Sequence, residues 1–218
     1  VILSRSITGN SIGAKLTIPQ GTLFTDSSGN SWLSARDVTW YSNVTTCKVP
    51  IVQHEKYTAS ALNNMLIPTG DRVIIHLGTL PNGKYYEQGS MSLQIGGETW
   101  VLVDTFAKSK PTDKHFMVSV DEALNPYIMF GDGTFGKKPA AGAKITNVVF
   151  YLTNGTQGNV KSNTITSVPS IISSSITDAT VSNAYDAGGG SNYENFIMLK
   201  EHIPLSVKTL GVAITKED

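Results

Sequence analysis

Apolar and polar positions alternate over short stretches through most of this 218-residue chain. Residues 14–18, AKLTI, show the pattern, and valine, isoleucine and threonine cluster in further short runs. Because β-branched residues suit a half-buried pleated surface, the pattern predicts strands. The other predicted strands span residues 38–41, 47–52, 72–77, 91–95, 99–103, 116–120, 127–130 and 145–152.

Turn-forming residues separate these strands at roughly the 8–12 residue spacing typical of antiparallel sheets. The Gly-Asn pair in DSSGN, residues 26–30, predicts a hairpin turn after LFT. We therefore expect a mainly β fold with minor α (α+β). It would consist of antiparallel strand meanders with a short C-terminal helix, in an elongated molecule.

That C-terminal helix is predicted over residues 191–203, SNYENFIMLKEHI. Ser191 and Glu194 have the spacing of a capping box, in which each side chain hydrogen-bonds a free backbone N–H at the helix start. One face of the helix would be apolar and pack on the sheet, through Phe196, Leu199 and Ile203. A second, shorter helix is expected over 58–66, with Thr58 or Ser60 as its cap.

The chain divides by pattern into three segments, 1–58, 59–126 and 127–218. We expect an N-terminal β segment, a β meander that could be an inserted subdomain, and a β region with a polar arm. The polar stretch 154–192 fits either a linker or weak strands in an extended arm, because isolated apolar residues interrupt it. The sequence opens at Val1 inside an apolar run, so we interpret it as a fragment of a longer protein.

Seventeen basic and seventeen acidic side chains cancel. Nucleic acids and anionic lipids select net positive surfaces, so we expect neither as a partner. The apolar runs are far shorter than the ~20 residues that span a bilayer, and we expect no membrane contact.

The stretch GDGTFGKK, residues 131–138, resembles a nucleotide-binding loop by its spacing of glycines and lysine. A phosphate loop needs Ser or Thr after the lysine and a helix beyond it. Lys138 stands in the magnesium position, and Pro139 with a β-branched run follows. We therefore predict a tight turn with Asp132-Gly133 at a hairpin corner, and no nucleotide binding.

Other catalytic patterns also fail on their context. Ser11 in GNSIG matches a nucleophile elbow by letter, but a strand-like segment follows it instead of a helix. Asp26 opens a faint calcium-loop pattern that lacks the required glycine and glutamate, which favours a solvated hairpin turn. Cys47 has no cysteine partner for zinc, and His54 no second histidine. We expect no enzyme activity, no cofactor, no metal and no small-molecule substrate.

The run from residue 130 to residue 160 resembles the signature of the baseplate J-like family of contractile phage tails. That family carries a Phe-Gly-Asp-Gly turn, a further glycine, a bend with proline and glycine, a strand, and a Gly-Asn turn. In this chain the corresponding residues are Phe130, Gly131, Asp132, Gly133, Gly136, Pro139, Gly142, 145–152 and Gly158-Asn159.

Two flanking stretches agree with this resemblance, which covers roughly residues 15–58 and 127–218. Residues 18–32 look like the family's Pro-x-Gly-Thr strand–turn–strand. Residues 186–218 resemble its segment of paired glycines, glutamate-led helix, proline and closing Thr-x-x-Asp. The meander between them looks most like the large wedge subunits of T-even-type myophages.

The resemblance implies a structural role in a virion. Members of the family pair and join into a ring around the tail hub, and this ring ties the baseplate wedges together. Its rearrangement is coupled to sheath contraction. The implied partners are a second copy of the chain, as a dimer, and other wedge and hub proteins. Assembly would take place in the bacterial host cytoplasm.

Two alternatives of other classes remain open. The three tryptophans, Trp32, Trp40 and Trp100, could stack on sugars, which would fit a carbohydrate-binding or adhesin module of a phage tail. An esterase-like hydrolase would instead use Ser11. Glycan binding would support the first alternative, and ester turnover lost in Ser11→Ala would support the second.

Overall fold

The structure is a computed structural model, and it describes residues 1–5 and 15–192. Ser11 lies outside the described residues. So do Glu194, Phe196, Leu199 and Ile203, which means that the helix expected over 191–203 and its packing stay predictions.

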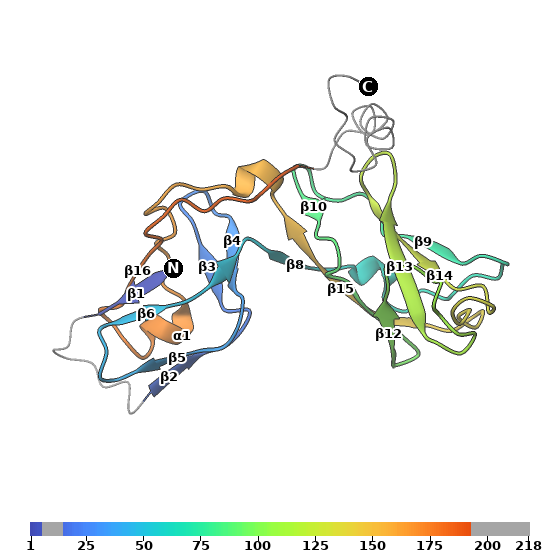
Figure 1. Cartoon of the computed structure of the whole chain (residues 1–218), viewed down its shortest axis with the longest axis horizontal. Helices are drawn as coiled ribbons and strands as arrows, with labels where there is room; N and C mark the ends of the chain where they lie inside the picture. The colour runs from blue at the N-terminus through green and yellow to red at the C-terminus, as the bar shows by residue number, and fades with distance from the viewer. Residues whose placement is uncertain (6–14, 193–218) are drawn as a thin grey trace, which may run out of the picture.

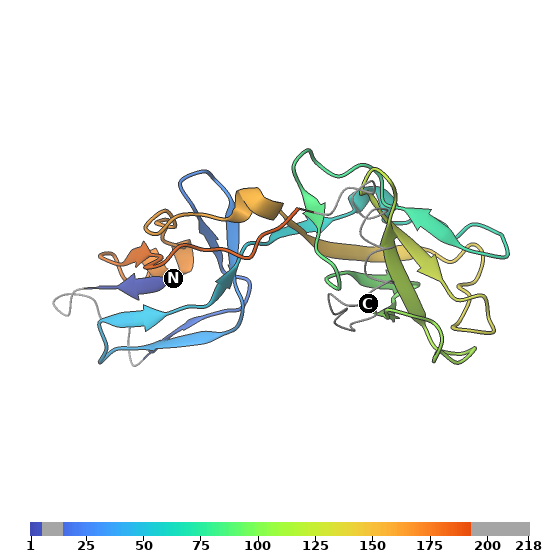
Figure 2. The same cartoon turned by 45° about the horizontal axis from the view of Figure 1, so that its top comes forward.

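Two lobes follow one another along the long axis of the molecule (Figure 1). We call residues 1–5, 15–52 and 159–187 the first lobe, and residues 55–153 the second lobe. Figure 2 shows the same two lobes, joined by segments that cross between them. The mainly β fold with minor α is confirmed, and the molecule is elongated.

The first lobe is built from three small antiparallel sheets. One sheet has the order β16 (Thr180–Ser182), β1 (Ile2–Ser4), β6 (Thr46–Lys48). Another pairs β2 (Lys15–Ile18) with β5 (Val38–Tyr41). The third has the order β3 (Leu23–Thr25), β4 (Ser31–Ser34), β7 (Ile51–Val52). The β3–β4 pair confirms the hairpin predicted at DSSGN, and Gly29 at its turn has a φ of 82°.

The second lobe contains a single large sheet. Its order is β10 (Tyr85–Tyr86), β15 (Ile145–Thr153), β11 (Ser92–Ile95), β12 (Glu98–Leu102), β13 (His115–Val120), β14 (Pro126–Phe130), β9 (Ile74–His76). β8 (Glu55–Thr58) pairs with β15 as well. Its neighbouring strands are antiparallel, except that β12 and β13 run parallel.

Each lobe has its own hydrophobic core. The larger core, in the second lobe, includes Trp100, Phe116, Ile128, Phe130 and Phe150. The core of the first lobe combines residues from both ends of the described chain, namely Leu3, Phe24, Trp40, Ile172 and Val181. These cores divide the chain differently from the predicted segments 1–58, 59–126 and 127–218. The expected boundary at 126/127 falls inside the β13–β14 hairpin, and 127–153 belongs with the meander before it.

The predicted strands are confirmed with small shifts at their ends, except that 47–52 forms two strands. Val49 and Pro50 separate β6 from β7, because proline lacks the N–H that a continuing strand would donate. Pattern reasoning missed β1, β8 and β10, which are all short. β16 falls in the polar stretch 154–192, where weak strands were one of the two expectations.

The helix expected over 58–66 is wrong. β8 ends at Thr58, and only one 3₁₀ turn, η1 (Ser60–Leu62), follows it. The backbone N–H of Ala59 still donates to Val148 in the sheet, and Asn64 has a φ of 67°. Strand pairing on β15 therefore overrides the modest helical preference of this segment.

The polar stretch 154–192 is an extended arm over its described part, not a free linker. It holds the short helix η2 (Gly155–Gly158), then α1 (Ser170–Ser173) and β16. Its isolated apolar residues Ile165, Ile172, Ile176 and Val181 are buried in the core of the first lobe. The arm therefore supplies one side of that core.

Candidate functional site

The FGDG turn, residues 130–136, forms a compact loop after β14. One carboxylate oxygen of Asp132 accepts hydrogen bonds from the backbone N–H groups of Thr134 (2.7 Å) and Phe135 (2.8 Å). These bonds to Phe135 and Thr134 hold the pKa of Asp132 below its usual value. The N–H of Gly133 donates to the carbonyl of Gly136 at 3.0 Å and closes the loop.

The glycines of this turn meet two different demands. Gly133 has a φ of 94° and open space around it, so its role is conformational. Gly131 is buried against the backbone carbonyls of Phe135 and Gly136, where a Cβ atom would collide with main chain. Close packing of the loop on itself explains these glycines without a phosphate.

The expected hairpin around Asp132-Gly133 is wrong. β14 pairs with β13 and β9, whereas β15 pairs with β11, β10 and β8. In the strand order, β13, β12 and β11 lie between β14 and β15. The loop between β14 and β15 therefore crosses the sheet instead of joining neighbours. Residues 130–136 are still brought together as one turn, as the sequence predicted.

A groove of about 260 Å³ opens beside this turn, and we call it the FGDG groove. Its apolar lining includes Phe106, Met117 and Met129. Phe135 at the loop and Ile74 on β9 are 54% and 45% exposed, and both line this groove. β9 stands at the end of the strand order, so an exposed apolar surface adjoins a sheet edge.

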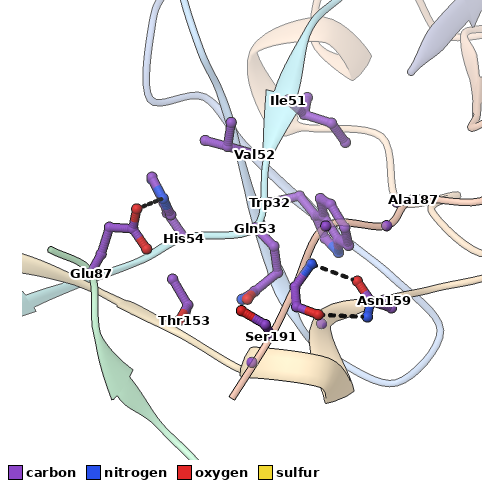
Figure 3. A pocket seen from close by; sticks show the side chains of 15 residues that line it. Trp32, Ile51, Val52, Gln53, His54, Glu87, Thr153, Asn159, Ala187 and Ser191 are labelled. Carbon is purple, nitrogen blue, oxygen red and sulfur yellow. Dashed lines mark hydrogen bonds and ion pairs between the residues drawn. The ribbon is translucent and has the colours of Figure 1, made fainter. Parts of the chain in front are cut away.

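A second hollow lies at the lobe junction, where three segments of the chain cross between the lobes. It has a volume of about 600 Å³, and β7, the start of η2 and residues 187–191 surround it (Figure 3). His54 lines it, stacks on Tyr151 with ring centroids 5.2 Å apart, and places Nε2 3.9 Å from Glu87. Ser191, which was predicted as a helix cap, is exposed and lines this cavity.

Asn154 is the centre of the junction. It is 5% exposed, and its backbone N–H donates to Gln53 Oε1 at 2.8 Å. Its side-chain Oδ1 accepts from Lys84 Nζ at 2.7 Å, and its Nδ2 donates to Asn30 in the first lobe. The side-chain amide of Asn154 therefore has hydrogen-bond partners for both its oxygen and its nitrogen, and its bond to Asn30 links the end of β15 to the first lobe.

Three glycines bring the crossing segments into close contact. A Cβ atom on Gly158 would collide with the side chain of Gln53, and one on Gly190 would collide with the carbonyl of Gly155. Asn159 also exchanges two hydrogen bonds with Gly190, at 2.9 and 2.8 Å (Figure 3). The missing side chains therefore let the crossing segments pack closely, with backbone against backbone where Gly190 meets Gly155.

Asp26 extends the network of Asn154 into the first lobe. Its carboxylate accepts from Trp32 Nε1 (3.1 Å), from Asn30 Nδ2 (2.9 Å), and from two backbone N–H groups. Burial raises the pKa of Asp26, but the hydrogen bonds from Trp32 and Asn30 outweigh that effect and hold the pKa below its usual value. Asp26 is buried, so the prediction of a solvated turn is wrong for this side chain.

The other candidates from the sequence are dispersed. Trp32, Trp40 and Trp100 are at most 5% exposed and belong to the hydrophobic cores, although Trp32 also lines the hollow at the lobe junction. Cys47 is buried, and burial raises the pKa of its thiol. Within residues 1–5 and 15–192, no group of three or more His, Cys, Asp or Glu side chains is placed to hold a metal. No helix among the same residues has the length and apolar character of a bilayer span.

No protein-family model matches the sequence, and neither curated proteins nor solved structures give a significant match. The resemblance to baseplate J-like proteins therefore rests on the motifs quoted above.

Sequence reasoning missed the residues that meet at the junction, Asn30, Glu55, Lys84 and Asn154. They come from distant segments, and no local pattern marks them. One signal was present in the sequence: Gly155 and Gly158, which begin and end η2, stand in an otherwise polar stretch.

Proposed function

We propose that this chain is a structural part of a contractile phage tail baseplate, where it joins neighbouring subunits by protein–protein contact. Its partners would be a second copy of the chain and the other wedge and hub proteins. The chain would act within the virion. The motif order that resembles the baseplate J-like family, from residue 18 to residue 218, supports this proposal.

The FGDG groove is the observation that carries the proposal. Protein interfaces are anchored by a few aromatic and other large side chains near apolar pockets. Phe135 is held in such a position by a turn whose backbone is fixed through Asp132 and Gly131. The same residues that carry the family resemblance thus present an exposed apolar side chain beside an edge strand.

The lobe junction gives the proposal mechanical support. A subunit that transmits a rearrangement to its neighbours must keep its two lobes in a fixed arrangement when force acts on it. Asn154 and the glycines at 155, 158 and 190 pack three crossing segments together. A buried polar network in which every group is hydrogen-bonded makes the packing rigid and favours one arrangement of the segments.

The test is made in the phage that encodes the chain, with Phe135→Ser in place of the natural residue. Val101→Ser is the matched control, because Val101 is 53% exposed but lies on β12 outside the FGDG groove. We expect electron microscopy of lysates to show fewer assembled baseplates for Phe135→Ser than for Val101→Ser. Deletion of the whole gene should abolish baseplates.

Two results would contradict the proposal. Assembled baseplates after deletion of the gene would exclude a structural role. Normal baseplates together with lost attachment to the host would instead favour the adhesin.

A further inference from the structure

Three side chains with the chemistry of an amide-forming reaction meet at the lobe junction. Lys84 lies in the loop before β10, Glu55 opens β8, and Asn154 directly follows β15. Lys84 Nζ is 2.6 Å from Glu55 Oε2 and 2.7 Å from Asn154 Oδ1. An amine, a carboxylate and a carboxamide from three separate segments therefore share one set of hydrogen bonds.

The amine donates a hydrogen bond to the carboxamide that it would attack. With Nζ in contact with Oδ1, the carboxamide carbon of Asn154 is one bond away from the atom that Nζ touches. Reacting groups that are held next to each other within one molecule gain a large rate advantage over the same groups in solution. The carboxamide of Asn154 belongs to a residue that is only 5% exposed, while the side chains of Lys84 and Glu55 are 24% and 42% exposed.

The orientation of the Asn154 amide is determined by its neighbours. Asn30 donates its Nδ2 hydrogen to Asp26 at 2.9 Å, which leaves Asn30 Oδ1 as an acceptor. That oxygen accepts from Asn154 Nδ2, so Oδ1 of Asn154 must face the lysine. The chain of bonds holds the carbonyl toward the amine and its charge, and the NH₂ group away from them.

We propose that Lys84 and Asn154 form an intramolecular isopeptide bond, with Glu55 as the catalytic base. Glu55 takes one proton from the Lys84 ammonium, and the freed lone pair of Nζ forms a bond to Cγ of Asn154. A second proton moves from Nζ to Nδ2, the Cγ–Nδ2 bond breaks, and ammonia leaves. The ammonia then accepts the proton held by Glu55, which restores the carboxylate. No oxidant, reductant or further reactant is consumed.

The bond would join the loop before β10 to the end of β15, beside the segments that cross between the lobes. A covalent link at this place would tie the loop before β10 to the start of the segment that returns to the first lobe, so that these two segments stay joined when hydrogen bonds alone would separate under load. The inference rests on the geometry of Lys84, Glu55 and Asn154 and does not depend on the proposed function.

Mass spectrometry of the purified full chain tests the inference. Loss of ammonia lowers the intact mass by about 17 Da relative to the sequence. Tryptic digestion should yield a branched peptide in which residues 73–108, uncleaved after Lys84, are joined to residues 145–161. Fragmentation of that peptide should locate the bond between Lys84 and Asn154.

Three variants serve as controls. Lys84→Arg keeps the positive charge but removes the amine, and should restore the full mass. Glu55→Gln keeps the shape but removes the base, and should slow or abolish the loss of ammonia. Lys161→Arg alters an exposed lysine that pairs with Asp186 at 2.9 Å, and should leave the branched peptide unchanged.

Several outcomes would overturn the inference. A full intact mass with separate peptides 73–84 and 145–161 would exclude the bond. A succinimide from attack of the Gly155 backbone nitrogen on Asn154 also removes ammonia, but it persists in Lys84→Arg and gives no branched peptide. A branched peptide formed at the same rate in Glu55→Gln would remove the base role assigned to Glu55.

Discussion

The two lobes differ in how far along the chain their partners lie. In the second lobe every strand finds its partners within residues 55–153, and some partners are consecutive strands, as β11 with β12 and β13 with β14 are. In the first lobe β1 pairs with β16, so that Leu3 lies opposite Val181. One lobe is a contiguous insertion of residues 55–153, and the other is completed only when the chain returns to it.

The second lobe can therefore start to fold from local contacts, whereas the first lobe can form only after a long loop has closed. Contacts between distant residues are slow to form because the entropy of the intervening chain must be lost first. The second lobe brings the two halves of the first lobe together when it folds. We therefore expect the second lobe to be independent of the first, and the first to depend on the second.

Cutting the chain should give the largest effect. A fragment of residues 54–153 should fold alone and unfold cooperatively in urea, because its core is complete. A fragment of residues 1–52 should not fold, because it lacks the buried residues Ile165, Ile172, Ile176 and Val181. Circular dichroism and NMR dispersion would report both outcomes. A folded 1–52 fragment would contradict the proposed dependence.

Truncating one core residue in each lobe should show how far the stability of each lobe depends on the other within the whole chain. Phe116 and Trp40 are both fully buried, so Phe116→Ala and Trp40→Ala should each cost about 3–5 kcal/mol. Hydrogen exchange should show protection lost in both lobes for Phe116→Ala. For Trp40→Ala it should be lost mainly in the first lobe. Equal losses in both lobes for both variants would show that the two lobes unfold as one unit.

Adding a methyl group to a glycine in each lobe compares two kinds of turn. Gly131→Ala should cost about 3 kcal/mol, because the new Cβ meets the backbone of Phe135 and Gly136. Gly29→Ala in the β3–β4 turn should cost about 1 kcal/mol, because its φ of 82° is unfavourable but its surroundings are open. Urea unfolding of both variants gives the comparison. A smaller cost for Gly131→Ala would contradict the close packing of the FGDG turn.

Replacing one carboxylate in each lobe should give the smallest effect, and it depends on pH. The pKa of Asp26 is lowered in the folded chain, so its contribution is present above the unfolded value of about 3.9 and is lost as pH falls through the folded pKa. Asp26→Asn should cost about 1 kcal/mol at neutral pH and should flatten the loss of stability in acid.

The matched change in the second lobe is Glu98→Gln. Hydrogen bonding to Lys114 lowers the pKa of Glu98, but this pair is exposed and screened by water and salt. Its effect on urea unfolding should be smaller than that of Asp26→Asn. An equal pH profile for the two variants would show that the network around Asp26 adds nothing beyond surface charge.

The candidate sites were predictable to different degrees. The FGDG turn was found because glycine and aspartate positions carry local backbone information, and Asp132 hydrogen-bonds its own loop. The hairpin expected around it was wrong because the neighbour of a strand is decided by the sheet. The junction was missed altogether, since Asn30 and Asn154 are far apart in the chain and meet only through the crossing of the lobes.

The sequence by itself determined the longer strands, the β3–β4 hairpin and the tight turn after β14, because alternation and turn residues act over a few positions. Only the tertiary structure decided that 58–66 is not a helix, that the polar arm completes the first lobe, and that 127–153 belongs to the second. Those outcomes depend on which distant surfaces bury one another. Residues such as Lys84 and Asn154 carry no local sign of that, because their partners are fixed by the path of the whole chain.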